Sequence, residues 1–199
     1  KQKLEQDKTM AELAMLKAQI NPHFFFNSLN SIYSLTYSNI EDSRNALHTL
    51  SRMMRYLLYS TEERTTLLKE AEFMRDFIAL MKLRANSKLT ITTNIPENIH
   101  DYPIVPMLLL PLVENAFKHG IHATDKSEIH ITLTQNGNNL EFEVENTYFE
   151  KSSTTNEGGI GLTNTKRRLQ LIYPNKHSLK AGIAPNGMYN VKLQITLEQ

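Results

Sequence analysis

The spacing of apolar residues predicts that the chain begins with a long helix. Residues from about 4 to 35 contain no glycine, and their apolar positions recur every three or four residues, which is typical of an amphipathic helix. Pro22 lies inside this stretch. Because proline removes a backbone donor and clashes with the preceding turn, we expect a kink near His23.

A second helix is predicted after a polar turn. Residues 37–43 are largely polar, and Asp42 or Ser43 is placed to cap the helix that follows. One side of that helix would carry the apolar residues Leu47, Leu50, Met54 and Leu57. Two helices joined by a short turn form an antiparallel hairpin. Because the three phenylalanines at 24–26 wrap most of the way around the first helix, a lone hairpin cannot bury them all, and we expect a homodimer with a four-helix bundle.

The rest of the chain mixes helical and strand patterns. Helices are predicted at about 67–85, 107–118 and 160–172, and strands at 89–93, 129–133, 140–144, 178–183 and 188–197. Residues 136–138 read NGN between two alternating runs, which is a hairpin signal. An antiparallel sheet with helices on one face follows from this order, so the fold class is α+β.

Composition narrows the function classes. Hydrophobic residues make up 40% of the 199 residues and charged residues 22%, as in folded proteins. A net charge of +1 gives no basic field for nucleic acid, so no nucleic-acid partner is expected. With no cysteine, disulfides and thiolate metal sites are excluded. The apolar run at 107–113 is too short to span a bilayer. Because Lys1 opens directly in a charged helical pattern, we expect a fragment whose upstream part is missing.

A first group of reactive residues surrounds His23. Residues 19–27 read QINPHFFFN, which places Gln19, His23 and Asn27 on one helical face within an apolar stretch. A histidine imidazole is largely neutral and nucleophilic near pH 7. An isolated helical histidine is more often structural, but buried polar groups need partners or a function. Asn27 is placed to hydrogen-bond the imidazole or to hold a water near it.

A second group lies on the predicted helix at 107–118 and beyond it. Residues 112–120 read LVENAFKHG, in which the Asn115 amide oxygen suits Mg²⁺ and Lys118 can contact phosphate. Residues 158–161 read GGIG before a helix, whose N-terminal N–H groups can bind anionic oxygens. A nucleophile together with a triphosphate and magnesium site indicates phosphoryl transfer to histidine.

These three parts, in this order, resemble the LytS/YehU-type sensor histidine kinases over essentially the whole chain. Residues 19–27 resemble the phosphoacceptor motif of that family, residues 114–120 its ATP-binding asparagine box, and residues 159–164 with Arg168 and Leu169 its glycine box. The resemblance implies a protein-histidine kinase that autophosphorylates from ATP and Mg²⁺. It also implies onward transfer to an aspartate of a response regulator receiver domain.

The resemblance also implies an architecture. A dimerisation and phosphotransfer hairpin would occupy residues 1–66. A Bergerat-type ATP-binding domain, an α/β sandwich with a mixed and mainly antiparallel sheet, would occupy 67–199, with 67–86 as a connecting helix. An upstream sensor with a transmembrane segment would precede the chain, which would then be the cytoplasmic domain of an inner-membrane protein.

Roles for individual residues follow from the resemblance as well. His23 would be the phosphoacceptor, Asn27 and Glu114 would take part in catalysis, and Asn115 would ligate Mg²⁺. The segment 148–159 would be the ATP lid. The residues implied in ATP binding are Asn115, Lys118, His119, Asn146, Gly159, Gly161, Leu162 and Arg168.

Two positions depart from related kinases. Where related domains carry an aspartate that accepts from the adenine amino group, this chain has Asn146, which can accept that bond only without charge. Many histidine kinases have an acidic residue directly after the phosphoacceptor, but here it is Phe24. Either Glu114 supplies the general base, or His23 needs none because it is already largely neutral.

Two other functions compete with a kinase. ATP hydrolases of the gyrase and Hsp90 kind position water with a glutamate four residues before the Mg²⁺ asparagine, and that position is Pro111 here. Hydrolysis is therefore disfavoured. The altered box at Asn146 keeps a second alternative open, a dimeric scaffold that has lost catalysis and signals through helix movement.

Overall fold

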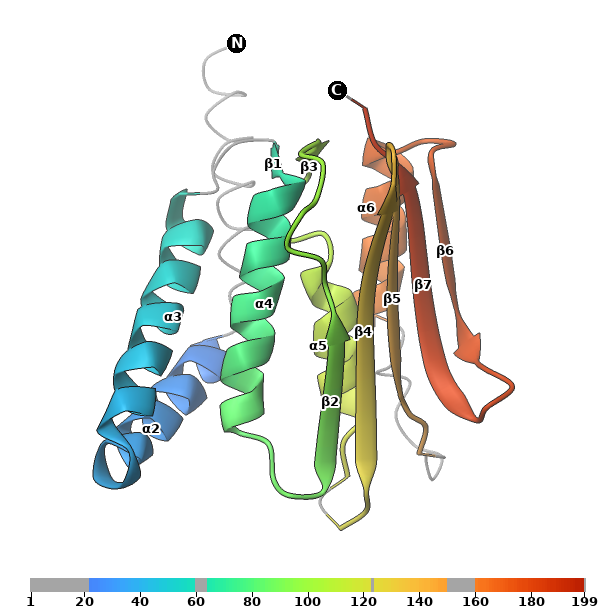
Figure 1. The fold of residues 1–199 in the computed structure, drawn as a ribbon. Helices are drawn as coiled ribbons and strands as arrows, with labels where there is room; N and C mark the ends of the chain where they lie inside the picture. The colour runs from blue at the N-terminus through green and yellow to red at the C-terminus, as the bar shows by residue number, and fades with distance from the viewer. Residues whose placement is uncertain (1–21, 60–63, 123, 150–159, 199) are drawn as a thin grey trace, which may run out of the picture. The chain divides into compact units, whose positions relative to one another are not determined.

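The computed structural model shows two compact units (Figure 1). It describes residues 22–59, 64–122, 124–149 and 160–198. The units are residues 1–59 and 60–199. Within the second unit, strand β1 (Thr65–Thr66) pairs with β3 (Pro103–Ile104).

The first unit contains the predicted helical hairpin. Its helices are α2 (Pro22–Ser38) and α3 (Ile40–Tyr59), which contact one another. The buried face of α2 repeats every four residues, at Phe24, Ser28 and Ile32. The predicted helix before Pro22, and the kink expected beside it, lie outside the described residues.

The turn between α2 and α3 is shorter than expected. Helix α2 continues to Ser38, so Asn39 alone separates the two helices. The Asn39 side-chain oxygen accepts from the Asp42 backbone N–H at 3.1 Å, which is the bond of an N-cap. The expected cap at Asp42 or Ser43 is therefore wrong, and the Ser43 hydroxyl instead donates to the Ile32 carbonyl.

The buried face of α3 also differs from the expected one. Its buried apolar residues are Ala46, Leu50, Met53 and Leu57. Leu47 is 53% exposed and Met54 37% exposed, so these two residues of the expected apolar side are not part of the buried face. The two sets share Leu50 and Leu57, and they differ in that Ala46 and Met53 are buried where Leu47 and Met54 were expected.

The second unit contains one five-stranded sheet and three helices among its described residues. The helices are α4 (Leu67–Leu83), α5 (Leu110–His119) and α6 (Ile160–Ile172). The sheet strands are β2 (Leu89–Asn94), β4 (Ser127–Asn136), β5 (Asn139–Thr147), β6 (His177–Ile183) and β7 (Met188–Thr196), in the order β2-β4-β5-β7-β6. Only β2 and β4 are parallel, which confirms the mixed and mainly antiparallel sheet. Gly137, with φ of 60°, makes the predicted hairpin turn.

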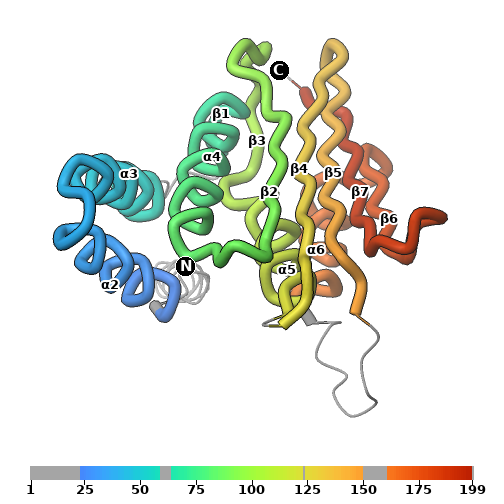
Figure 2. Tube along the Cα trace, turned by 60° about the horizontal axis from the view of Figure 1, so that its bottom comes forward, coloured from blue at the N-terminus to red at the C-terminus, as the bar shows by residue number. Residues whose placement is uncertain are grey.

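One face of the sheet forms the core. Strand β5 buries Leu140, Phe142 and Val144, and its neighbours contribute the residues in register with them. The glutamates that alternate with these residues lie on the other, polar face. Helices α5 and α6 cover the apolar face (Figure 2).

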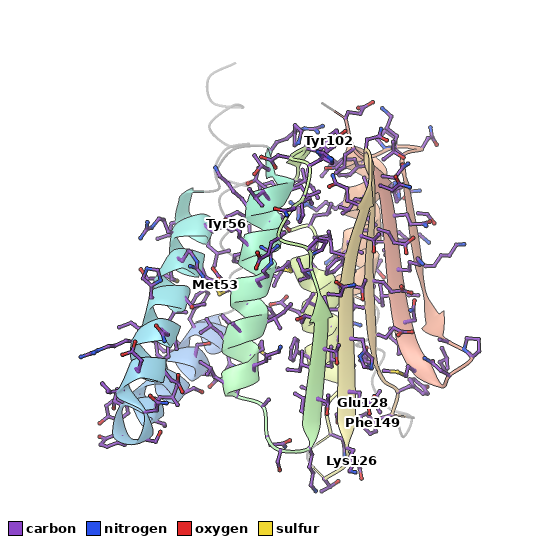
Figure 3. The ribbon with its side chains drawn as sticks, viewed as in Figure 1. Met53, Tyr56, Tyr102, Lys126, Glu128 and Phe149 are labelled. Atoms are coloured by element: carbon purple, nitrogen blue, oxygen red, sulfur yellow. The ribbon has the colours of Figure 1, made fainter. Side chains whose placement is uncertain are left out.

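Helix α4, the expected connecting helix, packs within the second unit. Nine of its residues are buried, and Phe77 packs edge-on against Phe117 of α5 at a centroid distance of 6.2 Å. Thr66 caps its first turn, and the Leu67 N–H donates to the carbonyl of Tyr102, which lies at the opposite end of the sheet from Glu128 and Phe149 (Figure 3). No helix within the described ranges is both long enough and apolar enough to cross a membrane.

Candidate functional site

His23 lies in the first turn of α2 with its side chain exposed. The Asn27 amide nitrogen lies 3.0 Å from its Nδ1 and 3.2 Å from its Nε2, so the predicted pairing one helical turn apart is present. The residue after His23, Phe24, faces the hairpin core instead. Helix α2 therefore packs against the hairpin core through Phe24. On its exposed side it presents the His23 imidazole, which Asn27 orients, to solvent.

The asparagine box lies on α5 with one apolar face and one polar face. Leu112, Val113 and Ala116 are buried against the rest of the unit. Asn115 is partly exposed and Lys118 is exposed, one turn further along. The amide and the ammonium group therefore lie on the same solvent-accessible side of the helix.

Glu114 has an unusual environment. Burial raises the pKa of its carboxyl group from 4.5 to about 7. A carboxyl group with such a pKa is divided between its acid and base forms at neutral pH, which is the state that suits a general base. Its sequence neighbour Asn115 supplies an amide oxygen, which is a ligand of the kind that Mg²⁺ prefers.

Asn146 lies on the helix-covered face of β5 and is 2% exposed. It packs directly on Gly120, the cap residue of α5, where an added Cβ would lie 2.5 Å from the Asn146 Cβ and 2.8 Å from its Cγ. The asparagine box therefore ends in glycine because only glycine lets α5 approach β5 this closely. Asn146, the residue expected at the adenine, is thereby brought to the C-terminal end of the helix that carries Asn115.

The glycine box is described from Ile160 onward. Gly161 lies in the first turn of α6, and nothing lies within 4 Å of where its Cβ would be. Among the described residues this space is open, so packing against them does not require a glycine at this position. Leu162 on α6 and His119 on α5 are partly exposed, whereas Gly159 lies outside the described residues.

Arg168 is held by the protein itself. Its Nη2 donates to the Pro106 carbonyl at 2.9 Å, and its Nη1 approaches the Met107 carbonyl at 3.5 Å. Met107 is 2% exposed and has φ of 55°, an arrangement that costs a non-glycine residue about 1–2 kcal/mol. The backbone N–H of Met107 donates to Glu70, a fully buried residue of α4.

Glu70 and Met107 were missed by sequence reasoning. Glu70 did leave one signal, because it is a charged residue on the face of α4 that also carries Leu67, Ala71 and Met74. A charge at such a position needs a partner. The positive φ of Met107 has no signature in the sequence.

The predicted site residues thus fall into two groups. His23 and Asn27 belong to the hairpin, and all the others to the second unit. Within the second unit, Asn115 and Lys118 lie on α5, and the C-cap of this helix, Gly120, packs on Asn146 of β5. The end of α5 and the start of α6 both point toward the end of the sheet at which β5 stops (Figure 1).

The chain is similar to several known proteins. The histidine kinase family model matches residues 11–89. The sensor histidine kinase BtsS of Escherichia coli is 28% identical over 94% of this chain and 34% of its own length. The sensor protein LytS of Staphylococcus haemolyticus is 32% identical over 85% of this chain and 31% of its own length. The chain therefore spans about a third of these curated relatives.

A solved structure shows the same fold. The histidine kinase domain of the Erythrobacter litoralis EL346 blue-light activated histidine kinase matches 89% of this chain and 96% of its own, with a TM-score of 0.50 and 13% identity. The family model, the relatives and the fold point to one group of proteins. The chain belongs to the family of sensor histidine kinases that includes LytS.

Proposed function

We propose that this chain transfers the γ-phosphoryl group of ATP to His23 and then to an aspartate of a response regulator receiver domain. The observation that carries the proposal is the exposed His23 imidazole, whose Nδ1 lies 3.0 Å from the Asn27 amide nitrogen. Transfer depends on a nucleophile that solvent and substrate can reach and that is held in a fixed direction. The membership in a kinase family supports the same reaction.

Phosphoryl transfer to His23 forms one bond to phosphorus and breaks another. A ring nitrogen of His23 uses its lone pair to form a bond to the γ-phosphorus, and the bond from that phosphorus to the β,γ-bridging oxygen breaks, so that ADP leaves. The phosphorylated ring then carries one proton more than its neutral form. Glu114 is our candidate acceptor for that proton, because burial holds its pKa at about 7. Asn27 keeps the ring in place before and after the transfer.

The residues present fit ATP and Mg²⁺. Asn115 offers an amide oxygen, which is a hard ligand for Mg²⁺, and Lys118 offers a positive charge for phosphate. The open space at Gly161, at the start of α6, suits an anionic oxygen. Mg²⁺ bound at Asn115 would neutralise the negative charge that develops on the phosphate oxygens. Asn146 is our candidate for the adenine amino group.

The hairpin surface supports the homodimer. Exposed apolar residues form one row on α2, at Phe26, Leu29, Tyr33 and Tyr37, and another on α3, at Ile40, Leu47, Met54 and Leu58. Phe26 is 67% exposed and Tyr37 76% exposed, which is costly for aromatic side chains in water. A second hairpin packed on these rows would complete a four-helix bundle, and the same helices would present His23 to the receiver domain.

The nucleotide part of this proposal is tested by calorimetry. Wild-type protein and Asn115→Ala are titrated with ATP in the presence of Mg²⁺, beside Asn98→Ala, which changes an exposed loop asparagine. We expect the wild type and Asn98→Ala to bind ATP with the same affinity. Asn115→Ala should lose at least about tenfold in affinity, which corresponds to about 1.4 kcal/mol of binding free energy. Equal affinity in all three would refute the assignment of Asn115.

A further inference from the structure

The start of α5 is held by a side chain from another helix. Leu109, the N-cap of α5, makes no side-chain cap of its own. Instead, the two carboxyl oxygens of Glu70 accept from the backbone N–H groups of Met107 at 3.0 Å and Leu109 at 3.2 Å. A carboxyl group at a helix N-terminus satisfies free donors and faces the positive end of the helix dipole. Glu70 thus replaces the missing cap from α4.

The opposite side of the same backbone segment is held from α6. Arg168 donates to the Pro106 carbonyl and approaches that of Met107. Met107 is therefore held at its N–H by Glu70 of α4 and at its carbonyl by Arg168 of α6. These contacts keep it in a left-handed conformation, which is unfavourable for a methionine without such support. Helix α5 lies between α4 and α6 in both views of the chain (Figures 1 and 2).

A third contact holds the same backbone segment two residues before Met107. The Val105 N–H donates to the Tyr173 hydroxyl oxygen at 3.2 Å, just beyond the end of α6. At its other end, α5 is fixed where Gly120 meets Asn146. If the contacts that hold Met107 are lost, the N-terminal end of α5 is therefore free to move, and the direction of the whole helix changes, including its middle, where Glu114 and Asn115 lie.

We propose that Glu70 and Arg168 are positioning residues of the nucleotide site, which hold Met107 and so fix the direction in which α5 presents Asn115. This inference rests on the proposed function. It also changes the role expected for Arg168, from a direct ATP contact to a support of α5. The two roles can be distinguished by affinity. If Arg168 contacts ATP directly, its removal lowers the affinity independently of Glu70; if it supports α5, the effects of removing the two residues are not independent.

The test measures the affinity for ATP with Mg²⁺ by calorimetry, at a temperature at which every variant is folded by circular dichroism. Glu70→Gln keeps the shape of the side chain but sets an NH₂ group against a backbone N–H. We expect its affinity to fall by about tenfold or more, since small displacements of a positioned group have effects of this size. Glu72→Gln, an exposed glutamate of α4, should bind within about twofold of the wild type.

Two further variants separate positioning from stability and from direct contact. Leu80→Ala removes a buried α4 side chain and lowers the melting temperature, yet its affinity for ATP with Mg²⁺ should stay near the wild-type value while it is folded. Arg168→Met should lower the affinity as Glu70→Gln does. The double variant should lose no more than the larger single effect, because both residues act on one segment.

Each outcome has a defined meaning. A folded Glu70→Gln that binds like the wild type would overturn the positioning role alone, and so would independent, multiplying effects of Glu70 and Arg168. If Glu70→Gln does not fold, Arg168→Met and Arg168→Lys carry the test, and unchanged affinity in both overturns the role. A wild type that binds no ATP would overturn the proposed function and this inference together.

Discussion

The raised pKa of Glu114 makes the stability of the second unit depend on pH in a direction that can be worked out. In the unfolded chain this carboxyl group has its ordinary pKa of 4.5, and in the folded chain burial raises the pKa to about 7. Below pH 4.5 both states hold the proton, so the stabilising contribution is fully present. As the pH rises toward 7, the unfolded state releases the proton first, and the contribution is lost.

The size of the effect follows from the shift. One pKa unit corresponds to 1.36 kcal/mol, so a shift from 4.5 to about 7 corresponds to about 3 kcal/mol between pH 4 and pH 8. Glu114→Gln cannot ionise and keeps nearly the same shape. We therefore expect this variant to match the wild type near pH 4 and to have a free energy of unfolding about 3 kcal/mol higher near pH 8.

The assay is urea unfolding followed by circular dichroism across this pH range. The difference between variant and wild type is the informative quantity, because other groups titrate too. A hydrogen bond from Lys192 lowers the pKa of Glu141, for example, so that contribution is lost as the pH falls, in the opposite direction. Glu72→Gln, which changes an exposed glutamate of α4, serves as the matched control. A Glu114→Gln difference that stays constant between pH 4 and pH 8 would refute the reasoning.

Other positions give predictions of different kinds. Gly120→Ala should lower the free energy of unfolding by about 1–3 kcal/mol in urea titrations, because its Cβ would overlap Asn146. Gly161→Ala should raise the free energy of unfolding by about 0.5–1 kcal/mol, because its Cβ meets open space among the described residues and alanine favours the helix. Calorimetry should show weaker ATP binding by the same variant if phosphate approaches the backbone of Gly161. Asn146→Ala should weaken ATP binding, and unchanged affinity would remove Asn146 from the site. Leu47→Glu should shift sedimentation from dimer to monomer with helix content retained; a stable dimer would contradict the proposed hairpin interface.

Much of the fold follows from local patterns. The strict alternation in β4 and β5 and the glycine turn between them predict a hairpin, and the structure confirms it because both periodicity and turn chemistry act over a few residues. The asparagine box is predicted on a helix for the same reason. Its polar residues recur one turn apart between apolar ones, and α5 presents them on the accessible side.

Other features depend on contacts that no local pattern records. Glu70 and Met107 are 37 positions apart, and Arg168 and Met107 are 61 apart, so their meeting depends on how α4 and α6 pack beside α5. The cap at Asn39 was missed because several capping residue types stand close together, and the backbone decides among them. Leu47 was placed on the same apolar side as Leu50 because α3 carries apolar residues on two sides, and among the described residues only the side with Ala46 and Met53 is buried.

The most direct test of the central claim is labelling of His23. The chain is incubated with γ-labelled ATP and Mg²⁺ beside His23→Gln, Asn115→Ala and His48→Gln, a matched control at an exposed histidine of α3. The account predicts label that is labile in acid and stable in alkali, present in the wild type and in His48→Gln, and absent from the other two. Label that persists in His23→Gln, or a wild type that binds ATP as a dimer and yet acquires no label, would contradict it.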